Sequence, residues 1–137
     1  MSAPDGDAPS LCVIDSGIEE AHLWLAPAMH TVSSRCFLPG TAANAVHDEA
    51  PGAGHGTRVA GAVFYPDAVP QQGNITALAW IQNARVADAT GYVPKALSPP
   101  RYLQDVVTHF TASEKATKLF NHSIACGTPC PTARMTA

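Results

Sequence analysis

The chain has 137 residues, of which 46% are hydrophobic and 14% are charged, and its formal net charge at pH 7 is -3. This length suits a single domain with a hydrophobic core. The slightly acidic balance gives no reason to expect nucleic acid or an anionic membrane as a partner, because both attract a basic excess. No apolar run approaches the roughly 20 residues needed to cross a bilayer, so we expect no membrane partner.

The N-terminal segment leads into a predicted buried strand. Residues 1–10 are polar and acidic and lack the basic and apolar regions of a secretory signal, so we expect a flexible lead-in and a cytoplasmic protein. Leu11-Cys12-Val13-Ile14 is a continuous apolar run that ends at Asp15-Ser16-Gly17. This pattern predicts a strand of a parallel sheet that is followed by a turn.

Less regular patterns follow up to residue 54. Residues 19–25 predict a short helix that Pro27 ends. Residues 32–38 predict a second strand, which Pro39-Gly40 closes. Residues 41–54 are mostly small and polar, which is typical of a surface loop.

The middle of the chain predicts one helix and one strand. Residues 55–64 have an apolar side at helical spacing, and residues 66–74 are typical of a loop. Two apolar segments follow, 75–80 and 84–87, and the polar pair Gln82-Asn83 lies between them. The second of these segments predicts a strand.

The last predicted elements are a helix and a strand. Residues 91–100 are typical of a loop, residues 102–119 have the spacing of an amphipathic helix, and residues 119–124 predict a strand. Strands, loops and helices therefore alternate along the chain. This alternation predicts an α/β domain with a mainly parallel sheet.

The four cysteines are Cys12, Cys36, Cys126 and Cys130. Cys12 lies in an apolar run, where a free thiol behaves as a small hydrophobic side chain. The spacing of Cys126 and Cys130 would suit a metal or a local disulfide, but no second Cys/His pair at finger-like spacing accompanies them. We expect unpaired structural thiols and no metal site.

Two segments carry candidate catalytic residues. Asp15 follows a predicted strand, and ligands and catalytic groups of open α/β sheets collect at the carboxyl ends of the strands. His55 begins a predicted helix between Gly54 and Gly56, and glycine lets backbone and substrate pass close to an imidazole. Taken singly, Asp15 could be a turn or helix cap and His55 a surface or capping histidine.

Together these segments resemble the subtilisin-like (subtilase) family of serine proteases. Val13-Ile14-Asp15-Ser16-Gly17-Ile18 is similar to the family's V-x-D-[ST]-G-I segment, and His55-Gly56-Thr57-Arg58-Val59-Ala60-Gly61 is similar to H-G-T-x-V-A-G. They occur in the family's order. The resemblance covers residues 11–127 and implies the N-terminal half of a three-layer, mostly parallel α/β catalytic domain. Residues 128–137 are expected to form an irregular tail.

The resemblance also implies roles for individual residues. His55 would be the general base, and Asp15 would orient its imidazole. Asn121-His122-Ser123-Ile124-Ala125 is similar to the family's N-x-S-[LI]-G stretch, so Ser123, Ile124 and Ala125 are predicted to bind an extended polypeptide substrate. No cofactor is implied.

The nucleophilic serine of the family lies in a G-T-S-[MA]-A segment, which is not recognisable in this sequence. Gly127-Thr128 is followed by Pro129. We therefore expect a fragment of a serine endopeptidase that is inactive alone and is complemented by a C-terminal half. The alternative is a non-catalytic peptide-binding module derived from the same fold.

A metal-dependent hydrolase is a third interpretation. His47, Asp48 and Glu49 could be combined with His55 into a ligand cluster. Their loop setting and the absence of helical i, i+4 spacing argue against it.

Overall fold

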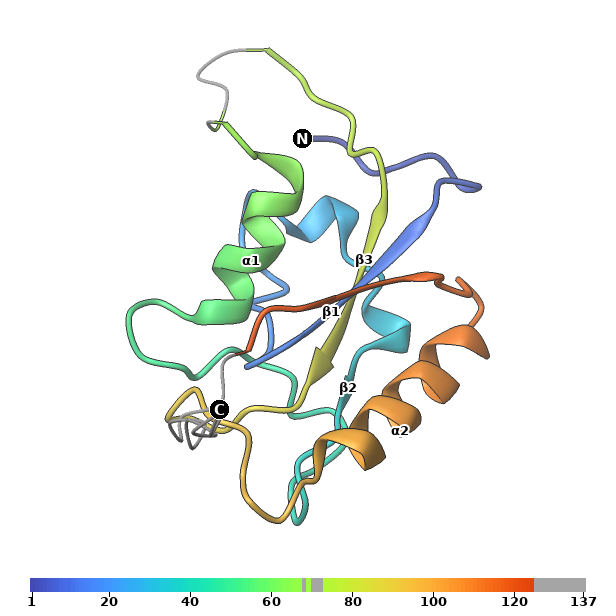
Figure 1. The fold of residues 1–137 in the computed structure, drawn as a ribbon. Helices are drawn as coiled ribbons and strands as arrows, with labels where there is room; N and C mark the ends of the chain where they lie inside the picture. Colours follow the sequence, from blue (N-terminus) through green and yellow to red (C-terminus); the bar gives the residue numbers. More distant parts are fainter. Residues whose placement is uncertain (68, 70–72, 125–137) are drawn as a thin grey trace, which may run out of the picture.

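The protein is built around a small parallel sheet, and its computed structural model describes residues 1–67, 69 and 73–124 (Figure 1). The elements in chain order are the strand β1 (Ser10–Asp15), the 3-10 helices η1 (Ala26–Ala28) and η2 (Thr31–Ser33), the strand β2 (Arg35–Cys36), the helix α1 (His55–Phe64), the strand β3 (Trp80–Arg85), the helix α2 (Pro99–Thr111) and the strand β4 (Leu119–His122).

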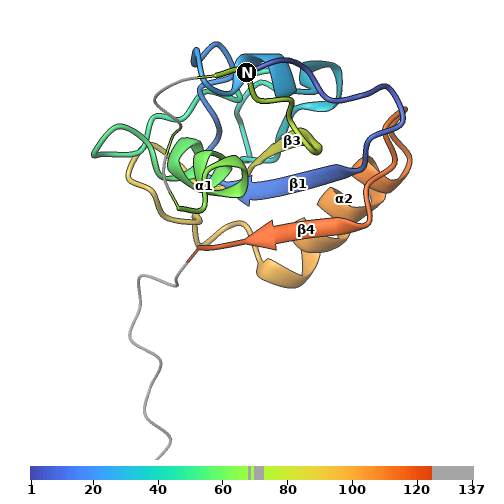
Figure 2. The same ribbon diagram turned by 90° about the horizontal axis from the view of Figure 1, so that it is seen from above.

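The strand order in the sheet is β2-β3-β1-β4, and every pair is parallel. β1 and β4 run side by side in the same direction in Figure 2. Asp15 pairs with Arg85, so β1 and β3 end at the same level. The predicted α/β class with a mainly parallel sheet is confirmed.

Both faces of the sheet are covered, which explains why the first strand is apolar at successive positions. Cys12 and Ile14 belong to a core cluster with Val106 and Phe110 of α2. Val13 points to the other face and belongs to a cluster with Ala60 of α1. Helix, sheet and helix therefore form the predicted three layers (Figure 1).

The third strand corrects one prediction, because Gln82 and Asn83 lie inside β3 and do not separate two segments. Both side chains are fully buried. The Gln82 amide donates to the Lys115 carbonyl at 2.8 Å, and the Asn83 amide donates to Glu20 at 3.0 Å and to the Val46 carbonyl at 3.1 Å. These distant partners accept hydrogen bonds from the two buried amide nitrogens, whereas the amide oxygens of Gln82 and Asn83 are buried without a hydrogen-bond partner in the described part of the chain.

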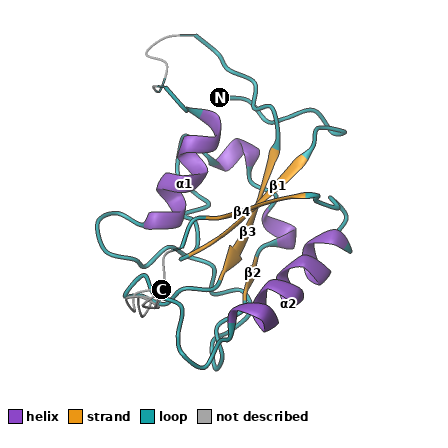
Figure 3. Cartoon of the chain, viewed as in Figure 1, coloured by secondary structure: helices purple, strands orange, loops and turns teal. Residues whose placement is uncertain are grey.

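Three other predicted elements are shorter, shifted or absent. The predicted helix at 19–25 is a series of turns, in which the His22 amide donates to the Glu19 carbonyl at 3.0 Å and the Leu25 amide donates to the His22 carbonyl at 2.8 Å. The predicted strand at 32–38 has only the two residues of β2, after a 3-10 turn. Most of the chain between β1 and α1 is loop (Figure 3).

The predicted helix at 102–119 also has different bounds. α2 begins at Pro99, where proline is favoured because the first helical amides have no partner within the helix. It ends at Thr111, and the chain then turns back toward the sheet. The buried Thr117 hydroxyl marks this return, since it donates to the Ser10 carbonyl at 2.6 Å.

The N-terminal residues contact the rest of the molecule, since the Ser2 amide donates to the Ile75 carbonyl at 2.8 Å. The domain boundaries stay predictions.

Within the described residues, no helix is long and apolar enough to cross a membrane. Cys12 and Cys36 are buried free thiols, whereas Cys126 and Cys130 lie outside the described residues.

Candidate active site

Asp15 and His55 meet where β1 ends and α1 begins. The Nδ1 atom of His55 lies 2.8 Å from Oδ1 of Asp15. The Asp15 side chain is only 2% exposed, whereas the His55 side chain is 46% exposed. A buried acceptor thus holds Nδ1 of the imidazole. The other nitrogen, Nε2, lies on the exposed side, where it can accept or donate a proton.

The carboxylate of Asp15 is fixed by its own turn. Its Oδ1 atom also accepts a hydrogen bond from the Ser16 amide at 2.7 Å, and the Ser16 hydroxyl lies 3.2 Å away. Its Oδ2 atom is buried and has no hydrogen-bond partner in the described part of the chain. The geometry therefore directs Oδ1 toward His55 while the carboxylate stays out of solvent.

Two glycines allow this close approach of strand and helix. A Cβ at Gly56 would lie 2.2 Å from the Gly17 carbonyl oxygen and 2.9 Å from the Asp15 Cβ. Gly17 has a φ of +105°, and a Cβ there would lie 2.5 Å from the Val46 carbonyl oxygen. Glycine at these positions is required by backbone packing around the Asp15–His55 pair.

The predicted substrate-binding residues lie near this pair. Ser123 and Ile124 line a cavity of about 430 Å³ together with His55. The other lining residues come from the loops around it and from α1: Ala50, Pro51, Arg58, Thr90, Gly91 and Tyr92. The Ser123 hydroxyl donates to Asn121 Oδ1 at 2.7 Å. Ala125, the third predicted residue, lies outside the described residues.

The residues of the possible metal cluster point to different partners. His47 lies 3.6 Å from Glu19, and Glu49 pairs with Arg85 at 2.6 Å. Across residues 1–67, 69 and 73–124, no group of three or more histidine, cysteine or acidic side chains could hold a metal ion. The structure therefore gives no support to the metal-dependent interpretation.

Asp48 is a site residue whose partners could not be read from the sequence. Its Oδ1 atom accepts from the Ser16 hydroxyl at 2.7 Å, and its Oδ2 atom accepts from the Thr57 amide at 2.7 Å. In the sequence, only its proximity to His55 indicates that Asp48 could belong to the site. Its contacts with both the Asp15 turn and α1 appear only in the folded chain.

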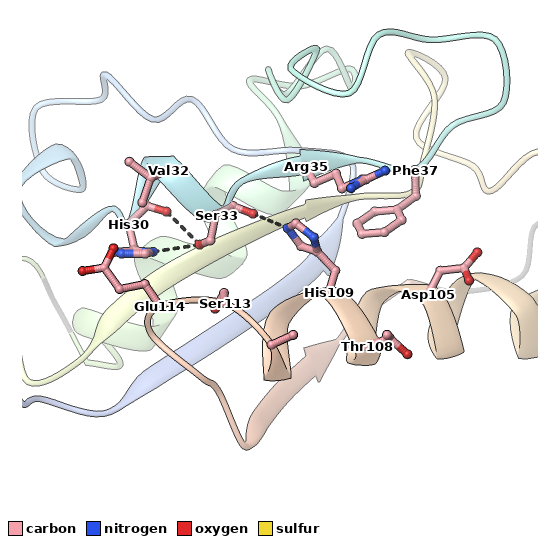
Figure 4. A pocket seen from close by; sticks show the side chains of 11 residues that line it. His30, Val32, Ser33, Arg35, Phe37, Asp105, Thr108, His109, Ser113 and Glu114 are labelled. Atoms are coloured by element: carbon pink, nitrogen blue, oxygen red, sulfur yellow. Dashed lines mark hydrogen bonds between the residues drawn. The ribbon is translucent and has the colours of Figure 1, made fainter.

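A second cavity, of about 830 Å³, lies between η2, β2 and α2 (Figure 4). Both of its histidines are hydrogen-bonded to Ser33: His30 Nδ1 lies 2.8 Å from the Ser33 hydroxyl, and His109 Nε2 lies 2.8 Å from the Ser33 carbonyl. Burial lowers the pKa of His30 below its ordinary value. Neither Asp15 nor His55 lines this cavity, so it is separate from the candidate active site.

Comparison with known proteins indicates the family of this chain. A family model described as the subtilase family matches residues 6–132, which is most of the chain. Comparison with curated proteins and with solved structures found no match. The chain therefore belongs to the subtilase family of serine peptidases.

Proposed function

We propose that Asp15 and His55 are the orienting carboxylate and the general base of a peptide-hydrolysing site. The observation that carries this proposal is the 2.8 Å contact between Nδ1 of the half-exposed His55 and Oδ1 of the buried Asp15. A nucleophilic serine would be supplied by polypeptide outside these 137 residues, such as a complementing C-terminal half.

The proposed reaction is acyl transfer to serine followed by hydrolysis. Nε2 of His55 takes the proton of the serine hydroxyl as the oxygen attacks the peptide carbonyl, and then gives it to the leaving amine. Water, activated by the same nitrogen, then releases the acyl group and restores the serine. Asp15 keeps the proton on Nδ1 and stabilises the imidazolium that forms. These steps use side chains only and take no cofactor.

The serines near the pair are poor candidates for the nucleophile. Ser16 is buried and contacts Asp15 Oδ1, which places its hydroxyl beside Nδ1 rather than Nε2. The Ser123 hydroxyl is engaged with Asn121. We therefore assign Ser123, Ile124 and Ala125 to binding an extended polypeptide substrate, with the cavity of about 430 Å³ next to His55 as support.

The test is labelling with a serine-directed fluorophosphonate. The purified chain is expected not to react, and the chain produced together with a segment that carries a G-T-S-x-A serine is expected to react and to cleave casein. His55→Ala and Asp15→Asn should lower the turnover of that assembly by about 10⁴ or more. Labelling of the purified chain alone, at a serine within it, would contradict the proposal.

A non-catalytic peptide-binding module is the second candidate. It is favoured by one observation, namely that Ser123, Ile124 and His55 already line one cavity within the chain. If this is the function, the chain alone should bind extended peptides without cleaving them, as measured by calorimetry and mass spectrometry. Ile124→Asp should weaken this binding, and Leu78→Asp, a change at an exposed side chain that does not line the cavity, should not.

A further inference from the structure

We propose that Asp48 is a positioning residue that sets which ring nitrogen of His55 carries the proton. This inference rests on the proposed function, in which the Nδ1–H tautomer leaves Nε2 free to act as the base. Asp48 does not touch the imidazole. It acts through Ser16 on one side and through the start of α1 on the other.

The first contact controls a hydroxyl proton. The Ser16 hydroxyl lies 2.7 Å from Asp48 Oδ1 and 3.2 Å from Asp15 Oδ1, and it has one hydrogen to donate. The shorter distance indicates that the Ser16 hydroxyl donates its hydrogen bond to Asp48 Oδ1. The Gly56 amide donates to the Ser16 oxygen at 3.1 Å, which helps to hold the hydroxyl in this orientation. Asp15 Oδ1 is thus left to the Ser16 amide and to His55.

The second contact anchors the helix that carries His55. Asp48 Oδ2 accepts from the Thr57 amide at 2.7 Å and from the Thr57 hydroxyl at 2.8 Å. Thr57 is the third residue of α1, and the residue before the helix, Gly54, makes no side-chain cap. Asp48 therefore caps the helix from outside it, where a negative charge is favourable.

The loop that carries Asp48 is itself tied to the sheet. The buried Arg85 donates to Glu49 at 2.6 Å and to the Ala45 carbonyl at 3.0 Å, and Asn83 donates to the Val46 carbonyl at 3.1 Å. These contacts come from the strand next to β1. One carboxylate on this loop thus joins the Asp15 turn and α1.

Loss of the carboxylate has a defined consequence. The Ser16 hydroxyl would then turn to Asp15 Oδ1 and compete there with Nδ1–H of His55. Without a strong acceptor for Nδ1–H, a histidine ring in water favours the Nε2–H tautomer. In that tautomer Nε2 cannot accept the proton of a nucleophile. Asp48 would therefore affect the base without contacting it.

The experiment is NMR of the full chain with ¹⁵N-labelled histidine, in which the His55 signals are assigned from His55→Gln. The wild type is expected to show mainly the Nδ1–H tautomer, with the Nδ1 proton at low field. Asp48→Asn should lower the ratio of the Nδ1–H to the Nε2–H tautomer by about tenfold, as expected when a charge-assisted hydrogen bond is weakened. Asp105→Asn, the same change at an exposed carboxylate of α2, is the matched control and should leave the ratio unchanged.

Two further variants separate positioning from general stability. Ser16→Ala combined with Asp48→Asn removes the competing hydroxyl and should restore at least part of the ratio, which a merely structural role would not do. Ser16→Ala alone should keep the Nδ1–H tautomer, and this variant tests the idea even if Asp48→Asn unfolds. A fall in the ratio in Ser16→Ala, or no change in a folded Asp48→Asn, would overturn the inference. Since the tautomer is measured without a serine, lack of peptidase activity leaves this result standing.

Discussion

A Cβ atom at Gly54 would lie 2.2 Å from Oδ2 of Asp48, the oxygen that accepts both hydrogen bonds from Thr57. Gly54 also has a φ of +82°, a conformation that side chains with a Cβ rarely adopt. The glycine before His55 thus makes room for the carboxylate that caps the helix.

Replacing Gly54 and replacing Gly61 should therefore change the free energy of unfolding in opposite directions. Gly54→Ala should lower the free energy of unfolding by about 2 kcal/mol or more, because strain and the clash with Asp48 add together. Gly61 lies within α1, and a Cβ there would have open space around it. Gly61→Ala should therefore raise that free energy by about 0.5–1 kcal/mol. Urea unfolding measures both, and an equal effect of the two changes would contradict this account.

The two residues of the Arg85–Glu49 ion pair are expected to contribute unequally to the free energy of unfolding. The Arg85 side chain is 4% exposed and the Glu49 side chain 59% exposed. Glu49→Gln should cost at most about 1 kcal/mol, because the pair is solvated on that side. Arg85→Met should cost about 3 kcal/mol, because it leaves the carbonyls of Ala45 and Ala87 without their donor. Similar losses in the two variants, measured by urea unfolding, would show that the backbone contacts of Arg85 matter little.

Cys12 should resist alkylation in the folded chain. Its side chain is fully buried in the central strand, and burial raises the pKa of its thiol well above the ordinary value. The reactive thiolate should therefore form only when the sheet opens. Iodoacetamide labelling of Cys12, followed by peptide mass spectrometry, should be at least about a hundredfold slower without urea than in the unfolded chain. A native rate close to the unfolded rate would mean that β1 is not held in the sheet.

His30 should make stability depend on pH. Burial lowers the pKa of His30 below its ordinary 6.5, and the attraction of Glu114 offsets only part of this effect. The unfolded chain then binds this proton more readily, so the contribution of His30 is complete above about pH 6.5 and is lost as the pH falls from there toward the lowered pKa. The difference in unfolding free energy between the wild type and His30→Gln should change in that window. A difference that stays constant with pH would contradict the prediction.

Much of the site could be predicted from local patterns. The apolar run that ends at Asp15 predicts a strand buried on both faces, and the turn after it needs Gly17 for its backbone conformation. The helix that begins at His55 has the predicted bounds, because its apolar side and the following proline are local signals. Their meeting at 2.8 Å agrees with the family resemblance, which implies that the two residues act together.

Other parts depended on contacts between distant segments. Gln82 and Asn83 are a polar pair that separates two apolar segments in the sequence, yet both lie in β3, where acceptors from three other segments bind their amide nitrogens. Residues 19–25 form turns and not the predicted helix, and the Glu19 amide donates to the Thr57 hydroxyl of α1. No short sequence window contains these partners, so their effect could not be predicted from local preference.

The sequence by itself determined the fold class, the strand before Asp15, the helix after Gly54 and the family, because each of these depends on residues close together in the chain. Only the tertiary structure decided the contacts of Asp48. As a residue of a polar loop it could have been solvated or a metal ligand. Its two oxygens have defined roles only because β1, α1 and the Arg85 strand bring Ser16 and Thr57 to opposite sides of one carboxylate.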